Sequence, residues 1–117
     1  MNYCFPQCRN TNRSGLTGHV HEFLGSTRIS GPTAHNHRFA GISGPPIPTQ
    51  NNHVHEIITR TDDAVNHHHS FRLFSGPAIN VGNGRHVHFA RGETTFVLGH
   101  DHRFIFTTLI EEPIDRN

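Results

Sequence analysis

Histidine is the residue type in this sequence whose number and spacing could do chemistry. The 117-residue chain contains 13 histidines, and all except His68 are the outer residues of a His-x-His motif. Alternate residues of a β-strand point to the same side, so each motif aims two imidazoles in one direction. Neutral imidazole is a common ligand of transition metals. The predicted metal ligands are His19, His21, His35, His37, His53, His55, His67, His69, His86, His88, His100 and His102.

The six motifs form three copies of one unit. Each copy opens with His-Val-His, at His19, His53 and His86, so the period is 34 and then 33 residues. A second His-x-His motif follows 14 to 16 residues after the first, and related residues come after it: HRFAGISGPPIP, HSFRLFSGPAIN and HRFIFTTLIEEPI. A fixed period of this length indicates an internal repeat, with one supersecondary unit in each copy.

The residues around the histidines indicate strands joined by turns. Val, Ile, Phe and Thr are frequent there, while Gly-Pro pairs at 31 and 76, Gly-Pro-Pro at 44 and Gly-Asn-Gly at 82 leave no room for a long helix. Each motif shares a strand face with the residue two positions after it, which is nearly always Phe or Ile, and we expect this face to be the inner one. These residues are Phe23, Phe39, Ile57, Phe71, Ala90 and Phe104.

These patterns predict an all-β single domain of three two-stranded His-x-His repeats. They would form a small barrel, prism or solenoid with a histidine-lined interior, over residues 18–114, with repeats starting near 19, 53 and 86. A chain of 117 residues supports one small core, and a hydrophobic content of 32% makes that core thin. We therefore expect metal binding to contribute to folding.

A bound metal would also give the buried imidazole nitrogens a partner. Buried neutral imidazoles need partners for both ring nitrogens, which a lining of histidines cannot supply alone. Two paired motifs could aim four imidazoles at one ion, either with one site in each repeat or with each second motif paired to the next first motif. Zinc is the favoured ion, and copper or nickel is also possible. The other interpretation is a hydrogen-bonded imidazole stack without metal, and both predict sensitivity to acid.

The N-terminal segment, residues 1–17, precedes the repeats and contains the two cysteines, Cys4 and Cys8. Their spacing matches neither a Cys-x-x-Cys redox pair nor a zinc knuckle. We expect a flexible or subunit-linking arm in which both are candidates for intersubunit disulfides in an oxidising setting. A pair of reduced, unimportant thiols is the alternative. Residues 115–117 are expected to be a C-terminal tail.

Charge and hydropathy limit the partners. The net charge is +1, lysine is absent, and the ten arginines are scattered, so no nucleic-acid footprint is expected. No apolar run approaches the roughly 20 residues of a transmembrane helix, which predicts no membrane insertion. The N-terminus also lacks the basic and apolar regions of a signal peptide, so we do not expect general secretion.

Several runs of residues resemble a known family. HVHEF, HNHRFAG, NHVHEI, HHHSF, VGNGRHVHFARGETT and GHDHRFIF are similar to the YmaF family of small histidine-rich bacterial proteins, found largely in spore-forming Firmicutes; the resemblance covers roughly residues 18–111. It implies a bacterial setting and a spore or cell-surface location, since spore surface proteins are made in the mother cell without a signal peptide. A cytoplasmic location is the alternative.

Three function classes follow. The favoured one is a non-catalytic, metal-binding structural protein that self-assembles into a homo-oligomer or fibre, with cross-links through its cysteines. A soluble metal buffer or chaperone is the alternative. The third is a cupin-like metalloenzyme, for which His86, His88 and Glu93 give the best match. No catalytic triad or phosphate-binding loop is present to support an enzyme, so none is expected.

Overall fold

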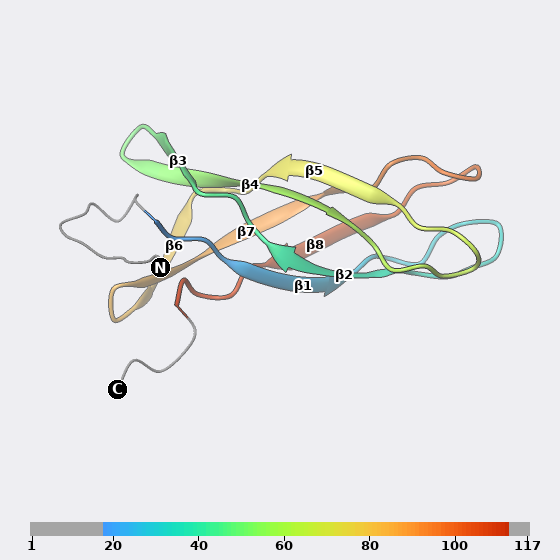
Figure 1. Cartoon of the computed structure of the whole chain (residues 1–117), viewed down its shortest axis with the longest axis horizontal. Helices are drawn as coiled ribbons and strands as arrows, with labels where there is room; N and C mark the ends of the chain where they lie inside the picture. The colour runs from blue at the N-terminus through green and yellow to red at the C-terminus, as the bar shows by residue number, and fades with distance from the viewer. Residues whose placement is uncertain (1–17, 113–117) are drawn as a thin grey trace.

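The computed structural model describes residues 18–112, and this part of the chain contains strands and turns with no helix. Most strands run along the long axis of the molecule (Figure 1). The all-β prediction is confirmed. The predicted arm (1–17), with Cys4 and Cys8, and the predicted tail (115–117) lie outside the described residues. The strands are β1 (Glu22–Ser26), β2 (Arg38–Ile42), β3 (Pro46–Thr49), β4 (Asn52–Arg60), β5 (Ser70–Phe74), β6 (Ala78–Gly82), β7 (Arg85–Glu93) and β8 (Arg103–Thr107).

The strands form three antiparallel sheets, one for each repeat, in the orders β1-β2, β3-β4-β5 and β6-β7-β8. Of the expected barrel, prism or solenoid, the closed barrel is wrong, because among residues 18–112 no hydrogen-bonded ladder continues from one sheet into the next. The second and third repeats also exceed the expected two strands. The extra strands β3 and β6 pair with the first halves of β4 and β7, where the first His-x-His motifs of these repeats lie.

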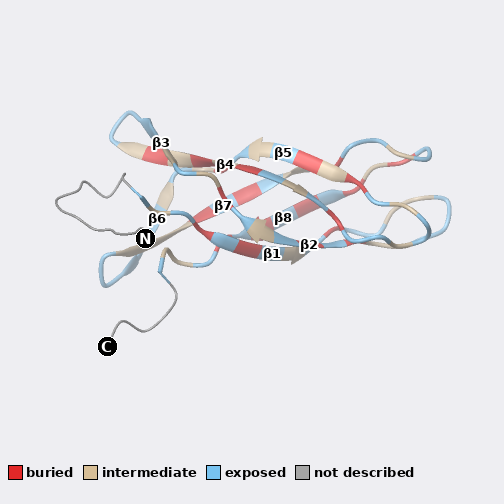
Figure 2. Ribbon diagram, in the orientation of Figure 1, coloured by how far each residue is buried: buried red, intermediate tan, exposed pale blue. Residues whose placement is uncertain are grey.

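The alternating pattern of each strand puts the predicted apolar residues inside. Figure 2 shows buried positions along the middle of the strands and exposed loops at both ends. Gly25 and Gly41 leave space for two of the rings, because a Cβ there would lie 2.7 Å from Cζ of Phe39 and 2.8 Å from Cζ of Phe23. The buried core cluster consists of Phe23, Phe39, Ile57, Phe71, Ala90, Phe104 and Phe106.

Backbone hydrogen bonds between repeats arrange the three sheets around one axis. The bonds at one end, with the N–H donor first, are Gly44 to Glu56, Gly76 to Phe89 and Leu109 to Glu22, at 2.8–2.9 Å. The bonds at the other end are Asp62 to Arg38, Thr95 to Ser70 and Arg28 to Arg103, at 2.8 Å. Because the third repeat returns to the first at both ends, all three histidine-bearing faces turn toward the same axis.

Candidate metal centres

The twelve predicted ligands gather into two clusters of six, and within each cluster the ligand nitrogens all lie within 4.8 Å of one another. The expectation of four imidazoles within a repeat, or between neighbouring motifs, is wrong. Each motif lies at the start of its strand or directly before it, and antiparallel strands begin at opposite ends of a sheet, so the two motifs of one repeat are held apart. The first cluster contains His19, His21, His53, His55, His86 and His88. The second cluster contains His35, His37, His67, His69, His100 and His102.

The two clusters lie at opposite ends of the apolar core. Thr27 lies opposite His37 in the first repeat, because its N–H donates to the His37 carbonyl at 2.9 Å. Six residues separate His21 from Thr27, which at about 3.3 Å per residue corresponds to about 20 Å along the strand. The clusters therefore do not share ligands and are separate sites.

The rings of each cluster are arranged as the vertices of an octahedron. Neighbouring rings meet edge-on, with centroids 4.4–5.2 Å apart and interplanar angles of 69–89° in the first cluster. The same contacts in the second cluster span 4.7–5.0 Å and 69–88°. The ring pairs without such a contact, which lie across the centre from each other among these described histidines, are His19/His88, His21/His53, His55/His86, His35/His69, His37/His100 and His67/His102.

Nitrogen distances agree with this geometry. Neighbouring Nε2 atoms lie 3.0–3.2 Å apart in the first cluster and 3.1–3.3 Å apart in the second. In a regular octahedron the centre lies at the edge length divided by √2, which is about 2.1–2.3 Å from each nitrogen here. That distance is close to the roughly 2.0–2.1 Å of metal–imidazole bonds in zinc sites. Each cluster could therefore hold one six-coordinate ion at its centre.

The second histidine of each motif is called the inner one here, and the first is called the outer one. The three inner histidines of each cluster are oriented by the neighbouring repeat. Each Nδ1–H donates to a backbone carbonyl at 2.8–3.1 Å, so each ring is fixed at the seam between two repeats. In the first cluster the pairs are His21 with Leu109, His55 with Gly44 and His88 with Gly76. In the second they are His37 with Asp62, His69 with Thr95 and His102 with Arg28.

Hydroxyl groups fix the backbone of the same six histidines. Each inner histidine donates its N–H to a buried Ser or Thr oxygen across its own sheet, at 3.0–3.1 Å. The sequence analysis missed these residues, although they recur at equivalent positions of the repeat and an alignment of the three copies shows them. They are Ser43, Ser75 and Thr108 for the first cluster and Thr27, Thr61 and Thr94 for the second.

These bonds determine where the imidazole protons lie. An Nδ1 that donates to a carbonyl carries the proton, so its Nε2 has a lone pair that points toward the cluster centre. In the second cluster, where the Nδ1 atoms of all six ligands face backbone carbonyls, the close Nε2 pairs are then lone pair against lone pair and are not hydrogen bonds. Consistent with this, Nε2 of His55, His88 and His102 is buried without a hydrogen-bond partner. A cation at the centre would satisfy all of these lone pairs at once.

The outer three histidines are held differently in the two clusters. In the second cluster the Nδ1–H groups of His35, His67 and His100 each donate to the carbonyl two residues earlier, within the same turn. Two of these turns place Val65 and Leu98 at φ of 51° and 52°, which is unfavourable for bulky side chains. The turns that orient the outer ligands of the second cluster are therefore strained at Val65 and Leu98.

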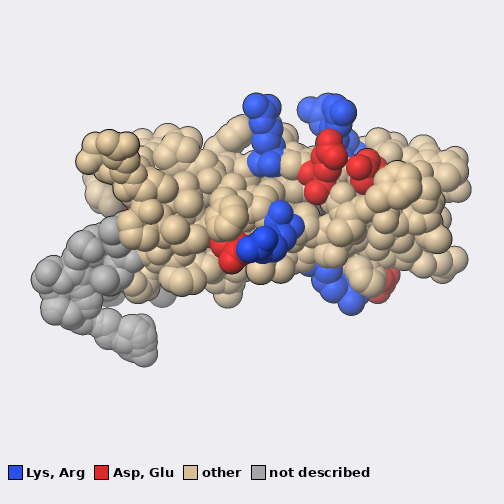
Figure 3. All heavy atoms as spheres, turned by 90° about the horizontal axis from the view of Figure 1, so that it is seen from above, with Lys and Arg blue, Asp and Glu red and all other residues tan. Residues whose placement is uncertain are grey.

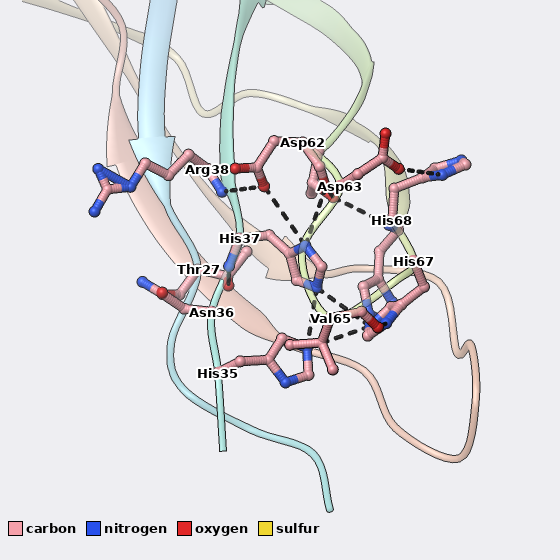
Figure 4. Close-up of polar contacts among 12 residues, drawn as sticks. Thr27, His35, Asn36, His37, Arg38, Asp62, Asp63, Val65, His67 and His68 are labelled. Atoms are coloured by element: carbon pink, nitrogen blue, oxygen red, sulfur yellow. Dashed lines mark hydrogen bonds and ion pairs between the residues drawn. The ribbon is translucent and has the colours of Figure 1, made fainter. Parts of the chain in front are cut away.

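Carboxylates approach both clusters. His86 donates its N–H to Glu111 Oε1 at 3.0 Å, and its Nδ1 lies 3.1 Å from Glu111 Oε2. Asp62 Oδ1 accepts the Arg38 N–H at 3.0 Å and lies 3.5 Å from His37 Nδ1. Figure 4 shows this carboxylate between Arg38 and the His37 ring, with the rings of His35, His37 and His67 pointing toward one another.

A glycine covers the second cluster. Gly31 adopts φ +95°, and a Cβ there would lie 3.0 Å from Cε1 of His35 and 3.2 Å from Nε2 of His100. A side chain at this position would therefore press against two ligand rings, which glycine avoids.

Burial keeps the ligands in the neutral form that metals need. Desolvation and, to a lesser degree, nearby imidazoles lower the pKa of His19 to about 2. The same two causes lower the pKa of His88 to about 3 and of His55 to about 4, against a backbone hydrogen bond that raises it. Desolvation also lowers the pKa of the other histidines with resolved shifts, against opposing contacts that raise it. These are His21, His37, His53, His69 and His102. Their rings need not lose a proton before ligation at neutral pH.

Two residues considered in the sequence analysis lie away from the clusters. His68 is 45% exposed in its side chain and lies 3.4 Å from an Asp63 oxygen. Glu93 is 56% exposed and faces Arg103 at 3.7 Å, because its position in β7 has the opposite parity to His86 and His88. The structure therefore does not assemble the cupin-like set of His86, His88 and Glu93, which was the third alternative from the sequence.

One comparison with known proteins gives a match. A family model described as spore germination protein GerY/YamF, named YmaF, matches residues 16–110. No curated protein and no solved structure matches the chain. Within residues 18–112 there is also no helix long and apolar enough to cross a membrane.

Proposed function

This chain belongs to the YmaF family of spore germination proteins (GerY/YamF), and we propose that it is a non-catalytic structural protein that binds two divalent transition-metal ions. Each ion would occupy the centre of one cluster and be bound by six imidazole Nε2 atoms. The family description supports a spore-associated role for the protein.

The observation that carries this proposal is the octahedral arrangement of inward lone pairs. Six neutral imidazoles with Nε2 atoms 3.0–3.3 Å apart repel one another unless a cation lies between them. Buried polar atoms in native proteins nearly always have a partner, so three buried Nε2 atoms without one among the described residues support the proposal of an ion at each centre. The alternative of a hydrogen-bonded imidazole stack lacks protons at the Nε2 atoms of the second cluster and of the inner ligands of the first, since the Nδ1 atoms hold them.

The geometry favours an ion with octahedral preference. Structural zinc sites are almost always four-coordinate, and four ligands would leave two lone pairs of each cluster unsatisfied. Copper(II) prefers tetragonal sites, whereas iron, cobalt and nickel accept six nitrogens, with affinity increasing in that order. We therefore propose nickel as the tightest regular octahedral occupant, in place of the zinc favoured by the sequence.

A structural role agrees with where the ligands come from. Each cluster takes two histidines from every repeat, so an ion would link all three sheets at each end of a small core. Six protein ligands leave no open coordination position, which catalytic metal sites normally keep for water or substrate. Saturated, buried coordination also disfavours rapid exchange, which argues against the alternative of a metal buffer or chaperone.

Self-assembly remains part of the proposal because the outer faces of the sheets carry exposed large apolar residues. Figure 3 shows one face on which charged side chains occur in small groups and uncharged residues cover most of the surface. Such surfaces are typical of protein contacts, and Cys4 and Cys8 would then link subunits. The exposed apolar residues on these sheets include Leu24, Ile42, Ile58, Phe74, Phe89 and Ile105.

Metal content and stability test the proposal together. Protein purified without an affinity tag or added metal should contain two ions per chain by elemental mass spectrometry. Removing them with a chelator should lower the melting temperature strongly, since binding at a thousandfold excess over Kd contributes about 4 kcal/mol for each site. A buffer would show the same content with little loss of stability, and a metal-free, stable protein would contradict the proposal.

Assembly needs a separate measurement. Sedimentation of the metal-loaded protein, with and without reductant, should show a multimer. On denaturing gels the wild type should show a reductant-sensitive multimer, which the Cys4→Ser, Cys8→Ser double variant loses. A monomer under all conditions would remove self-assembly and leave the metal sites unaffected.

A further inference from the structure

Among residues 18–112, Glu111 is the one carboxylate that contacts an outer ligand of either cluster. Both of its carboxylate oxygens face the same ligand, with Oε1 accepting the His86 N–H at 3.0 Å and Oε2 lying 3.1 Å from His86 Nδ1. The His86 and Glu111 side chains are only 15% and 13% exposed. This is a fixed two-point contact between a carboxylate and a ligand ring, on the side away from the cluster centre.

The other outer ligands of the first cluster lack such support. Within residues 18–112, Nδ1 of His19 and His53 makes no hydrogen bond, although His53 donates its backbone N–H to Asn52 Oδ1 at 2.8 Å. In the second cluster each outer histidine is oriented by a carbonyl of its own turn. His86 is therefore the outer ligand of the first cluster whose ring direction and proton position are fixed.

The negative charge of Glu111 would also stabilise a cation in the first cluster. Six neutral imidazoles around a divalent ion leave a net charge of about +2 in a buried site, which is costly without a nearby anion. Asp62, the carboxylate near the second cluster, is 52% exposed and 3.5 Å from His37, so water screens its charge. The Glu111 charge is already felt at the first cluster, because it raises the pKa of His21 and His53 against the larger lowering by desolvation.

We propose that Glu111 is a positioning residue of the first cluster, which holds His86 in its Nδ1–H tautomer and makes this cluster the tighter of the two metal sites. This inference rests on the proposed function, because it concerns the affinity of a site that must first bind an ion. Partners that orient a ligating histidine typically account for 10- to 100-fold in metal affinity.

Glu111→Gln is the test variant. The amide oxygen can still accept the His86 N–H, but the amide NH₂ group cannot accept a proton from Nδ1. The contact then favours a proton on Nε2, where it blocks ligation. The controls are Asp62→Asn, which changes the exposed carboxylate of the second cluster, and Glu93→Gln, which changes an exposed carboxylate outside both.

Competition titrations with Ni²⁺ and a chelator of known affinity should resolve two Kd values in the wild-type protein. In Glu111→Gln the tighter value should weaken 10- to 100-fold while the other remains unchanged, and the melting temperature of the metal-free protein should stay within a few degrees. Glu93→Gln should match the wild type. Two wild-type values in Glu111→Gln would overturn the inference and leave the proposed function intact. A wild type without Ni²⁺ binding would overturn both.

A measurement on the wild type keeps the inference testable if the variant does not fold. In Co²⁺-loaded protein the ligand Nδ1–H protons give paramagnetically shifted NMR signals. Among the outer ligands of the first cluster, the His86 signal should exchange with water at least tenfold more slowly than those of His19 and His53. Equal exchange of the three signals would contradict the role of Glu111.

Discussion

The two clusters are built alike on the inside and differently on the outside. Their inner histidines use one design: Nδ1 on a carbonyl of the next repeat and N–H on a Ser or Thr oxygen of the same sheet. Their outer histidines do not. The second cluster relies on its own tight turns and is covered by Gly31, whereas the first uses the carboxylate of Glu111.

This difference shows which parts of a site a repeat can encode. The inner ligands lie on strands or directly before them, at the seams between repeats. The repeat reproduces these positions three times, so each copy has equivalent partners. The outer ligands lie where strands meet turns and the end of the described chain, and there the three copies differ in length and sequence. We therefore expect the clusters to match in coordination and to differ in affinity and exchange.

The largest expected effect comes from removing an inner ligand of either cluster. His21→Ala and His37→Ala should each reduce the ion content from two to one per chain, because the ion loses one of its six imidazoles and the remaining five bind it far more weakly at micromolar metal. His68→Ala should retain both ions, since its ring lies outside both clusters. Elemental analysis checks this, and equal losses from all three variants would contradict the assignment of ligands.

Acid should reveal the deeper desolvation of the first cluster. His55 has a pKa of about 4 and His88 of about 3 in the folded protein, against 6.5 in the unfolded chain. Below pH 6.5 the unfolded chain takes up protons that the folded protein does not. Stability should therefore be greatest above pH 6.5 and fall as the pH drops toward 4, by about 1.4 kcal/mol per pH unit for each such histidine.

Denaturant unfolding of the metal-free protein between pH 7.5 and 4.5 measures this slope. NMR titration should show the His55 and His88 rings still neutral at pH 5. A midpoint near 6.5 for these two rings would show that the first cluster is open to water.

A methyl group at Gly31 should damage the second cluster alone. Gly31→Ala adds a Cβ that is 3.0 Å from His35 and 3.2 Å from Nε2 of His100, so those ligands must move. We expect at least tenfold weaker Ni²⁺ binding at this cluster and unchanged binding at the first. Gly99→Ala is the matched control, since its φ of +83° imposes the same backbone cost with nothing within 4 Å of the new Cβ. Equal losses in both variants would assign the effect to backbone strain.

The smallest expected effects come from removing the hydroxyl groups that hold the inner histidines. The loss in the free energy of unfolding should be equal in the two clusters. Ser43→Ala and Thr61→Val each remove a buried hydroxyl that accepts an inner-histidine N–H, from His21 and His69 respectively. Leaving that N–H without a partner should cost roughly 1–3 kcal/mol in the free energy of unfolding. Thr107→Val, on an exposed position of β8, should cost less than about 0.5 kcal/mol. Unequal losses at Ser43 and Thr61 would show that the inner histidines are not held alike.

Part of this architecture could be predicted from the sequence. The strand period of two identified the inward face, including His21, His37 and Phe39, because alternation depends only on local geometry. The grouping of motifs was missed, although it follows from a simple rule: motifs at the start of antiparallel strands lie at opposite ends of the sheet. The octahedral geometry and the contact from Glu111 depend on how three repeats close around an axis. No local pattern contains that information.

The most direct test of two six-imidazole sites is X-ray absorption spectroscopy of the Ni²⁺-loaded protein at two ions per chain. The account predicts a first shell of six nitrogens at about 2.1–2.2 Å, with the outer-shell scattering of imidazole rings and no difference in coordination number between the sites. A shell of four nitrogens near 2.0 Å, or a mixture of imidazole with several water oxygens, would contradict it.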